Sequence, residues 1–297
     1  MSVTVRVPAK VNVQLAVGAA RPDGFHDLAN VFLAVSLYDE VTAAPADGLT
    51  ITCEGPDADK VPLDRTNLAA RAAELLAARH GISPDVHLHI KKDIPVAGGM
   101  AGGSADGAGA LLACDELWGL GTPREVLLEI CAELGSDVPF SLVGGAALGT
   151  GRGERLTALP VGGTFHWVFA VADGGLSTPA VYGEFDRLAE GVEVPEPAAS
   201  PALLDALASG DTTALAATLA NDLQAPALSL RPSLAATLAA GTEAGALAAL
   251  VSGSGPTTAF LVKDAEAAET VAAALVASGT CRTARTTTSP APGAAVL

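Results

Sequence analysis

Apolar and polar residues alternate over the first part of the chain. The odd positions from Val3 to Leu15 are apolar, whereas Lys10, Asn12 and Gln14 share the opposite face. This period of two predicts a strand with one buried face. Its polar face is a candidate wall for a binding site, and the alternative for Lys10 is a lysine exposed to solvent.

Periodicity also predicts the other elements. Apolar or alternating runs predict strands at 31–41, 49–53, 86–91, 142–153, 166–172, 258–262 and 282–288. Helical patterns predict helices at 67–79, 108–118, 122–135 and 264–278, with several Ala-rich helices within 201–249. We expect 190–201 to be a surface loop and 290–297 a loose tail.

A Gly-rich loop separates one strand from the next helix. Four glycines lie within 98–103, after the strand at 86–91, and Ser104 or Asp106 could cap the helix at 108–118. A strand, a Gly-rich turn and a helix N-terminus direct unpaired N–H groups at one point, which suits phosphate. The spacing fits neither GxxxxGK[ST] nor GxGxxG, and the alternative is a flexible linker turn.

The balance of charges narrows the classes of partner. The chain of 297 residues is 49% apolar and 17% charged and has a formal net charge of −16, which suits a globular protein of about two domains. Its negative field would repel nucleic acid and anionic membranes, so we expect neither as a partner. A phosphorylated small molecule would have to be bound by local basic groups, N–H dipoles and Mg²⁺.

The cysteines and the N-terminus favour a cytoplasmic protein. The four cysteines form neither a CxxC pair nor a metal-ligand pattern, and we expect them to be reduced thiols. The N-terminus enters a strand without an apolar signal region, and no stretch of about 18 apolar residues could span a membrane.

Three further segments place chemically useful residues at turns. Phe25 and His26 follow a Pro-Asp-Gly turn, Asp137 stands between a helix and an apolar run, and 252–255 form a second Gly/Ser turn. Each has an ordinary structural alternative. These are core packing for Phe25, a cap or core position for His26, a cap or turn for Asp137, and a hairpin turn for 252–255.

Together these motifs resemble those of the GHMP kinases. The resemblance spans about residues 4–288 and is carried by Pro8-Ala9-Lys10-Val11-Asn12, Asp23-Gly24-Phe25-His26, the loop 95–106, Leu134-Gly135-Ser136-Asp137-Val138-Pro139-Phe140 and Ser252-Gly253-Ser254-Gly255. It implies an α+β fold of two lobes with the site between them. These are an N-terminal nucleotide-binding lobe (1–155) and a C-terminal ferredoxin-like lobe (156–297).

The resemblance also implies a role for each candidate residue. The reaction would be ATP-dependent phosphorylation of a hydroxyl of a cytidyl diphosphate substrate in the non-mevalonate isoprenoid route. Asp137 and Lys10 would be catalytic, and Mg²⁺ would be carried by ATP, with Ser104 as a candidate contact. The residues expected to bind ATP are Asn67, Lys92, Pro95, Val96, Ala97, Gly98, Gly99, Met100, Ala101, Gly102, Gly103, Ser104 and Ala105. Those expected to bind the second substrate are Asn12, Phe25, His26, Thr178 and Tyr182.

The chain departs from the family pattern at four positions. Phe25 stands where Tyr is usual, Ala97 and Ala101 where Gly is usual, and Ala105 where Ser is frequent. Ala101 therefore needs a backbone conformation that tolerates Cβ. The alternatives are another kinase of this family, acting on homoserine, mevalonate or a sugar, and a catalytically silent nucleotide-binding module. We expect a monomer or a weak homodimer.

Overall fold

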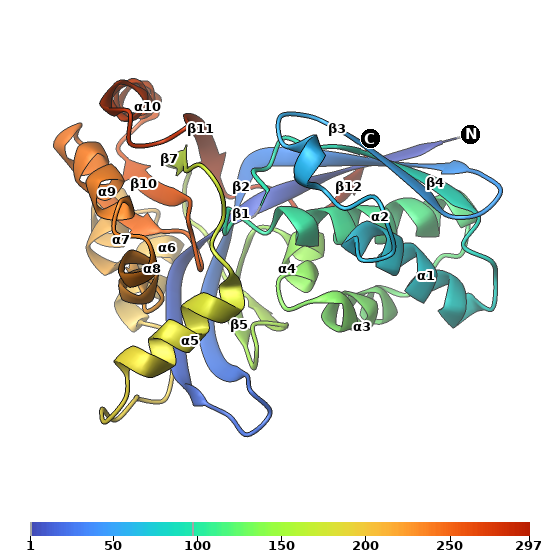
Figure 1. Cartoon of the computed structure of the whole chain (residues 1–297), viewed down its shortest axis with the longest axis horizontal. Coiled ribbons are helices and arrows are strands. Elements are labelled where there is room, and N and C mark those ends of the chain that lie inside the picture. The colour runs from blue at the N-terminus through green and yellow to red at the C-terminus, as the bar shows by residue number, and fades with distance from the viewer. Residues whose placement is uncertain (1, 97) are drawn as a thin grey trace.

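Two sheets form the framework of the molecule (Figure 1). The structure is a computed structural model that describes residues 2–96 and 98–297, and within them the sheets have eight and four strands. The larger sheet contains β1 (Val3–Ala20), β2 (His26–Pro45), β3 (Thr50–Glu54), β4 (Val86–Lys91), β5 (Ala146–Thr150), β6 (Arg155–Ala158), β8 (Ala220–Asn221) and β12 (Ala295–Val296). The smaller sheet contains β7 (Phe165–Val171), β9 (Ala248–Val251), β10 (Thr258–Val262) and β11 (Thr283–Ser289).

The long antiparallel pair of β1 and β2 connects both halves of the molecule. Its register runs from Val3 opposite Ala43 to Ala20 opposite His26. The predicted alternation is confirmed, because the odd positions from 5 to 17 are all buried. The polar face is buried as well: Lys10, Asn12 and Gln14 are each less than a tenth exposed. The prediction of a solvent-exposed lysine at position 10 is therefore wrong.

Helices cover one face of the larger sheet, as Figure 1 shows. They are α1 (Leu68–His80), α2 (Gly102–Trp118), α3 (Arg124–Leu134) and α4 (Val138–Val143). The middle helix of this layer, α2, lies directly against β1 and β2, and its alanines join the strand valines in one core. The start of α2 is thereby fixed relative to the residues of β1.

Helix α2 begins six residues earlier than predicted. It starts at Gly102 after Ala101, which adopts the left-handed conformation (φ 60°). Ser104 and Asp106 lie inside the first turns, so the prediction that one of them caps the helix is wrong, and no described side chain caps it. Close packing requires glycines in this part of the helix, because a Cβ at Gly102 would meet Lys92 Nζ and one at Gly107 would meet Leu68.

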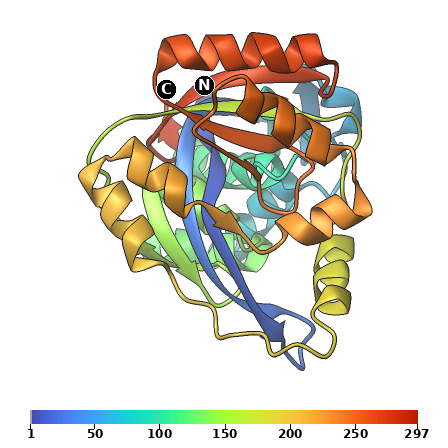
Figure 2. The same ribbon diagram turned by 90° about the vertical axis from the view of Figure 1, so that its left-hand side faces the viewer.

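The smaller sheet has the strand order β11-β7-β10-β9, and all its neighbours are antiparallel. The predicted strand, helix and strand at the end of the chain are confirmed as β10, α10 (Ala265–Ser278) and β11, and Figure 2 shows α10 lying across the top of this lobe. Residues Val168 and Phe260 pack under α10, while Trp167 and Phe169 face the core of the larger sheet. This arrangement is the expected ferredoxin-like C-terminal lobe.

The connecting helices follow the predicted Ala-rich region. They are α5 (Thr178–Leu188), α6 (Pro201–Ser209), α7 (Thr212–Thr218), α8 (Gln224–Leu230) and α9 (Leu234–Glu243). The surface loop expected at 190–201 is confirmed up to residue 200, since α6 begins at Pro201. No helix in residues 2–96 or 98–297 has the length and apolar content needed to cross a membrane.

The C-terminal segment is not the loose tail that the sequence predicts. Ala295 and Val296 pair with β1 as strand β12, Pro292 forms a bridge with Gly144, and Ala291 is buried. The open edge of β1 supplies the unpaired N–H and C=O groups that hold this segment.

Ion pairs also hold the two lobes together. Arg282, just before β11, forms a bidentate pair with Asp57 (2.6 and 2.7 Å). Arg285 on β11 pairs in the same way with Asp93 (2.9 and 2.6 Å), at the start of the segment that leads into the Gly-rich loop. The smaller sheet therefore helps to position that loop.

We predict that Gly241→Ala lowers the free energy of unfolding by about 1–3 kcal/mol, the usual cost of overpacking. Gly241 lies in α9, where a Cβ would overlap the buried ring of Phe260 on β10. Urea denaturation measures the change. Gly183→Ala is the matched control, since no atom lies within 4 Å of a Cβ built there. Equal stability of the two variants would contradict the described packing.

Candidate functional site

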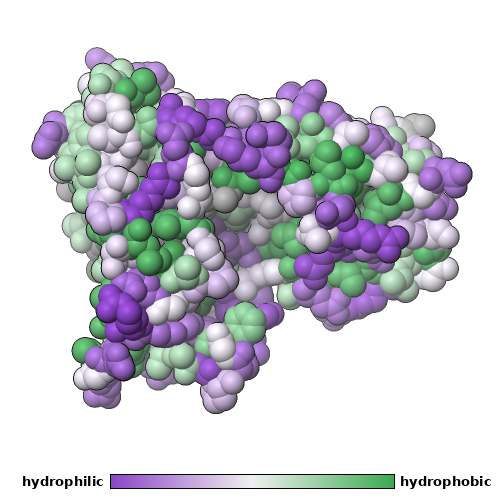
Figure 3. Space-filling model, in the orientation of Figure 1, coloured by the Kyte–Doolittle hydropathy of each residue, from purple (hydrophilic) through white to green (hydrophobic). Residues whose placement is uncertain are grey.

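A cleft of about 740 Å³ lies where the two lobes meet, and the molecule is visibly notched there (Figure 3). Both predicted catalytic residues and all five predicted substrate-binding residues line it: Lys10, Asn12, Phe25, His26, Asp137, Thr178 and Tyr182. The cleft is also lined by Gly98, Gly99, Ala101, Gly102, Gly103 and Ser104 of the Gly-rich segment and by Gly253, Ser254 and Gly255. The fold thus brings together motifs that lie far apart in the sequence.

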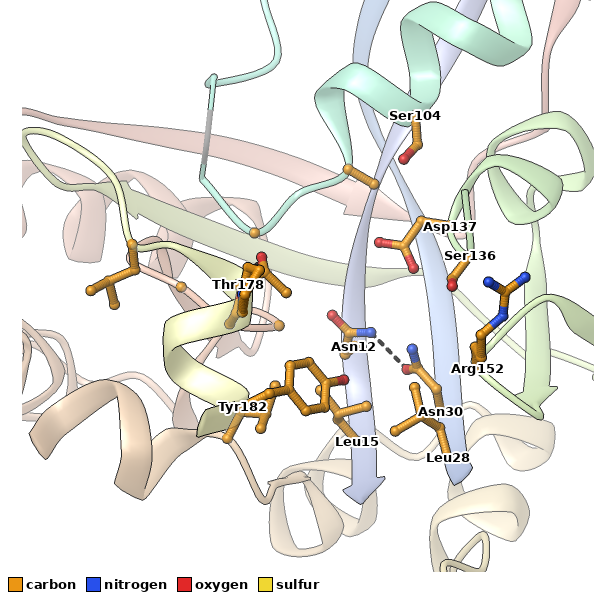
Figure 4. Close-up of a pocket in the computed structure, with 18 of the residues that line it drawn as sticks. Asn12, Leu15, Leu28, Asn30, Ser104, Ser136, Asp137, Arg152, Thr178 and Tyr182 are labelled. Atoms are coloured by element: carbon orange, nitrogen blue, oxygen red, sulfur yellow. Dashed lines mark hydrogen bonds between the residues drawn. The ribbon is translucent and has the colours of Figure 1, made fainter. Parts of the chain in front are cut away.

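The Lys10 ammonium lies at the centre of the cleft wall. Its Nζ donates hydrogen bonds to Asn12 Oδ1 (2.6 Å) and to the carbonyl of Gly99 (3.0 Å), and it lies 3.7 Å from Asp137 Oδ2. Asn12 Nδ2 in turn donates to Asn30 Oδ1 at 2.6 Å (Figure 4). Burial lowers the pKa of Lys10 below its ordinary value, and the neighbouring Asp137 opposes that shift. The ammonium is therefore oriented from three sides.

Asp137 stands at the turn between α3 and α4. It occupies the position before the first residue of α4, yet its side chain caps no N–H of the described helix. The carboxylate is about one-third exposed and points into the cleft beside Ser136 (Figure 4). It is thus placed next to Lys10 and open to a ligand.

Hydrogen bonds from both lobes hold the Gly-rich loop in place. The carbonyl of Gly99 accepts hydrogen bonds from Lys10 Nζ and from the hydroxyl of Ser252 (3.0 Å each). The hairpin alternative for 252–255 is also correct, because this segment joins β9 to β10. The same turn both closes a hairpin and holds the loop.

The start of α2 suits an anion. Ala101, Gly103 and Ser104 line the cleft at the positive end of the helix, where the first N–H groups have no partner within the helix. A Cβ at Gly103 would have only Leu68 near it, at 4.0 Å, so the surface there is open. The described residues contain no cluster of three or more His, Cys, Asp or Glu side chains that could hold a metal. These N–H donors suit a phosphate group.

Other residues of the predicted ATP-binding set lie elsewhere. Met100 and Ala105 are fully buried in the core, and Pro95 is buried beside Gly98. Val96 lines a smaller cavity of about 220 Å³, together with Asn67 and Lys92. Ala97 lies outside the described residues.

Lys92 belongs to a buried cluster of charges that the sequence did not reveal. Its Nζ lies 2.5 Å from Asp39 Oδ2 and 2.7 Å from Asp106 Oδ2, and all three side chains are nearly inaccessible to solvent. The backbone N–H groups of Asp93 and Ile94 donate to Asp39 Oδ1. Burial lowers the pKa of Lys92, but the two carboxylates outweigh it, so the net shift is upward. The cluster ties β2, α2 and the start of the loop together.

Asn67 also has a structural role. It caps α1 by accepting a hydrogen bond from the N–H of Ala69 (2.8 Å), and its Nδ2 donates to the carbonyl of Pro62 (2.7 Å). Asn67 and Lys92 therefore shape the wall of the smaller cavity while their polar atoms are engaged within the protein.

Aromatic residues line the far end of the cleft. Phe25 is 48% exposed, so the prediction of a core position for it is wrong. Tyr182 lies on α5 with its ring 5.0 Å from that of the buried His26. Thr178, one turn before Tyr182, shares a hydrogen bond with Ser254 (2.9 Å). The rings of Phe25, His26 and Tyr182 thus all line the cleft.

Four polar residues of the cleft were missed from the sequence: Asn30, Ser136, Arg152 and Asp186. Asp186 follows Thr178 and Tyr182 at steps of four residues, a helical spacing that could have revealed it. Arg152 stands between two glycines at the end of the run 142–153 that was predicted as a strand, and the structure has a turn there instead, so its signal was weaker. Ser136 stands next to Asp137 in the motif 134–140, which could have revealed it, whereas Asn30 carries no local signal.

Comparison with known proteins identifies related chains. The family model "GHMP kinases N terminal domain" matches residues 67–145, and "GHMP kinases C terminal" matches residues 203–280. The chain is 82% identical to the 4-diphosphocytidyl-2-C-methyl-D-erythritol kinase of Streptomyces avermitilis over the whole of both chains. It is 56% identical to the enzyme of that name from Mycobacterium tuberculosis, over 100% of this chain and 93% of the relative.

Solved structures show the same fold. A crystal structure of 4-(cytidine 5'-diphospho)-2C-methyl-D-erythritol kinase matches with a TM-score of 0.78 and 32% identity, covering 96% of this chain and 98% of the other. A homoserine kinase from Cytophaga hutchinsonii matches with a TM-score of 0.76 and 20% identity, over 100% and 97% of the two chains. This second likeness concerns the fold alone.

We predict that the cluster around Lys92 makes stability depend on pH. Burial, with Asp39 as a second carboxylate nearby, raises the pKa of Asp106 to about 7, although Lys92 acts in the opposite direction. The carboxyl of the unfolded chain titrates near pH ~3.9. Between these values the folded state binds more protons, so this group makes the free energy of unfolding fall as pH rises.

The test compares wild type with Asp106→Asn by urea denaturation between pH 4.5 and 8. As the pH rises to about 7, the free energy of unfolding of wild type should fall relative to that of the variant. Above pH 7 the two free energies should change with pH in the same way. Asp205→Asn, on the exposed side of α6, should show no such change. Parallel curves for wild type and Asp106→Asn over the whole range would refute the assignment.

Proposed function

The chain belongs to the GHMP kinase family and, within it, to the 4-diphosphocytidyl-2-C-methyl-D-erythritol kinases, and from this premise we propose that it transfers the γ-phosphate of ATP to the 2-hydroxyl of that cytidyl substrate. It is thus an ATP-dependent small-molecule kinase of the non-mevalonate isoprenoid route. One observation carries the proposal for the site: Lys10 and Asp137 lie 3.7 Å apart in the cleft that the N-terminus of α2 also faces.

Phosphoryl transfer depends on alignment and charge more than on covalent chemistry. The acceptor hydroxyl would donate a hydrogen bond to Asp137, which holds the oxygen in line with the γ-phosphorus. The new O–P bond forms as the bond from the γ-phosphorus to the bridging oxygen breaks, and ADP leaves with that oxygen. A carboxylate is too weak a base to ionise an alcohol beforehand, so Asp137 takes the proton late in the step.

Lys10 stabilises the charge that develops during transfer. Its ammonium is fixed by Asn12 and Gly99 before any substrate arrives, so little reorganisation is needed when the phosphate moves. Asn12 Oδ1 is occupied by Lys10, so Asn12 can offer the acceptor substrate only its remaining N–H. Lys10 and Asp137 therefore act as one unit.

The nucleotide phosphates are proposed to bind at the start of α2. Backbone N–H groups from about Gly98 to Ser104 would hold the phosphate oxygens. ATP would bring a bound Mg²⁺, which would neutralise phosphate charge, and the hydroxyl of Ser104, which lines the cleft, would contact it. Asn67 and Lys92 would shape the nucleotide side of the cleft, through the smaller cavity.

The aromatic end of the cleft suits the cytosine ring. We propose that Phe25 and Tyr182 stack on it, each stack contributing ~1–3 kcal/mol, while His26 meets the edge of the base and Thr178 a polar part of the substrate. Phe25 retains the stacking face of the tyrosine that is usual in this family. Homoserine, mevalonate and simple sugars have no flat base for such rings to stack on.

Arg152 is the proposed contact for the diphosphate of the substrate. Glycines with positive φ at positions 151 and 153 form its turn, and the carbonyl of Gly151 accepts a hydrogen bond from Leu28 N–H (2.8 Å). The guanidinium lies 5.1 Å from the centre of the Phe25 ring. Among the described residues its closest acidic neighbour is Glu154, at 4.0 Å, so its N–H groups remain available.

The proposal also covers the cellular environment, the lobe boundary and the oligomeric state. Four free cysteines are consistent with a reducing, cytoplasmic environment. We propose a lobe boundary near residue 155, close to the connection from β6 to β7, with β8 and β12 returning to the first lobe. A monomer or a weak homodimer would suffice, since the proposed sites for both substrates lie within one chain.

The function is tested by measuring ADP release with the cytidyl diphosphate substrate, homoserine, mevalonate and galactose. Turnover of the cytidyl substrate alone is expected. Turnover of another member instead would favour a different kinase of the family, and ATP binding without ADP release would favour the silent module.

We predict that Asp137→Asn lowers kcat by ~10²–10⁴ while KM changes little, because it removes a positioned proton acceptor. ADP release under saturating substrate measures the effect. The control is Glu133→Gln, on the exposed side of α3, which should keep wild-type kcat. A folded Asp137→Asn variant with near wild-type kcat would contradict the proposed catalytic role of Asp137.

We predict that Arg152→Gln raises KM for the cytidyl substrate by ~10–100-fold, the loss expected for hydrogen bonds to a charged group. The KM for ATP should not change. Arg155→Gln, at the start of β6 and with a side chain that is 79% exposed, is the control. If both arginine variants behaved alike, the diphosphate would have to bind elsewhere.

A further inference from the structure

We infer that Asp186 sets the base specificity of the cleft by holding His26 in the tautomer whose Nδ1 accepts a hydrogen bond. This inference rests on the proposed function, because it assumes that His26 meets the edge of the cytosine. Asp186 itself would not touch the substrate, so it is a positioning residue.

A direct hydrogen bond joins the two side chains. His26 Nε2 lies 2.9 Å from Asp186 Oδ1, and the pair connects the first residue of β2 to the third turn of α5. His26 is nearly buried and packs against the rings of Tyr182 (5.0 Å) and Phe185 (5.9 Å, edge to face). The imidazole is therefore held in one orientation by two rings and one carboxylate.

The chemistry of this contact selects one tautomer. A carboxylate can only accept hydrogen bonds, so Nε2 must carry the proton. In a neutral imidazole the other nitrogen, Nδ1, then has a free lone pair. No group of the described residues forms a hydrogen bond with Nδ1. Nδ1 is also not one of the fully buried atoms that lack a partner. It therefore retains access to the cleft that His26 lines.

An acceptor at this place distinguishes two pyrimidines. Cytosine carries an amino group at C4, which donates, whereas uracil carries a carbonyl there, which accepts. The Nδ1 lone pair would bind the amino group and repel the carbonyl. Placing two acceptors face to face costs about 1–3 kcal/mol, or ~10–100-fold in kcat/KM.

The helix that carries Asp186 supports this role. Thr178, Tyr182 and Asp186 occur at intervals of four residues, so one face of α5 presents all three to the cleft (Figure 4 labels the first two). Glu184 lies on the same helix but pairs with Arg187 and Ser229 and does not line the cleft. The two carboxylates of α5 thus offer a matched comparison.

The test measures kcat/KM for the cytidyl substrate and for its uridine analogue in wild type, Asp186→Asn and Glu184→Gln. An asparagine can turn its NH₂ toward Nε2 and so allow the other tautomer. We expect Asp186→Asn to lower the cytidyl-to-uridyl ratio by ~10-fold or more, mainly through a gain with the uridyl substrate, while KM for ATP stays constant. Glu184→Gln should keep the wild-type ratio.

The ¹⁵N chemical shifts of the His26 ring provide a second readout that does not depend on turnover. Wild type should show the proton on Nε2, and Asp186→Asn should show both tautomers. A wild-type ring protonated on Nδ1, or an unchanged selectivity ratio in a folded Asp186→Asn variant, would overturn the inference. If wild type failed to use the cytidyl substrate, the proposed function would fail, and the ring shifts would still decide the tautomer.

Discussion

The buried ammonium of Lys10 is the constraint on which the site depends. A charge in so closed a place is costly unless several groups compensate it, and the burial that lowers its pKa is a sign of that cost. Asn12, the carbonyl of Gly99 and Asp137 supply this compensation, and they come from a strand, a loop and a helix start. The same contacts that stabilise Lys10 therefore bring together Asp137, the proposed catalytic carboxylate, and the Gly-rich loop that we propose binds phosphate.

The loop is held from the other lobe as well. Ser252 shares the Gly99 carbonyl with Lys10, and Arg285 pairs with Asp93 at the start of the segment that leads into the loop. The site is thus complete only when the two lobes are packed. In a chain of net charge −16, the attraction for phosphorylated substrates would have to come from local N–H groups and from the cations proposed for this role at positions 10 and 152.

Local patterns predicted the parts of the fold that depend on neighbours in sequence. The alternation in β1 and the final β10, α10 and β11 were predicted correctly. One face of such an element is buried, so apolar residues recur with a regular period that a short stretch of sequence reveals. The start of α2 and the pairing of β12 were missed. Both involve distant partners, namely Lys92 packed against Gly102 and the free edge of β1 beside Val296.

The candidate site likewise contains residues that local motifs revealed and contacts that only the packed fold creates. Lys10, Asp137 and the Gly-rich loop were found because they stand in recognisable motifs, and the fold places them around one cleft. The pairing of Lys92 with Asp39, 53 residues away, could not be read from the chain, nor could the contact between Arg152 and Phe25. Such contacts exist only after the strands and turns are packed, so no local pattern records them.

A double-mutant cycle between Lys10 and Asp137 tests most directly whether the two residues act as a unit. The kcat of Lys10→Ala, Asp137→Asn and the double variant would be measured by ADP release from the cytidyl substrate, with folding checked for each. The account predicts that the double variant is scarcely slower than the slower single variant, because residues that act together lose their contribution together. A double variant whose loss equals the product of the two single losses would show that they act independently and would contradict the account.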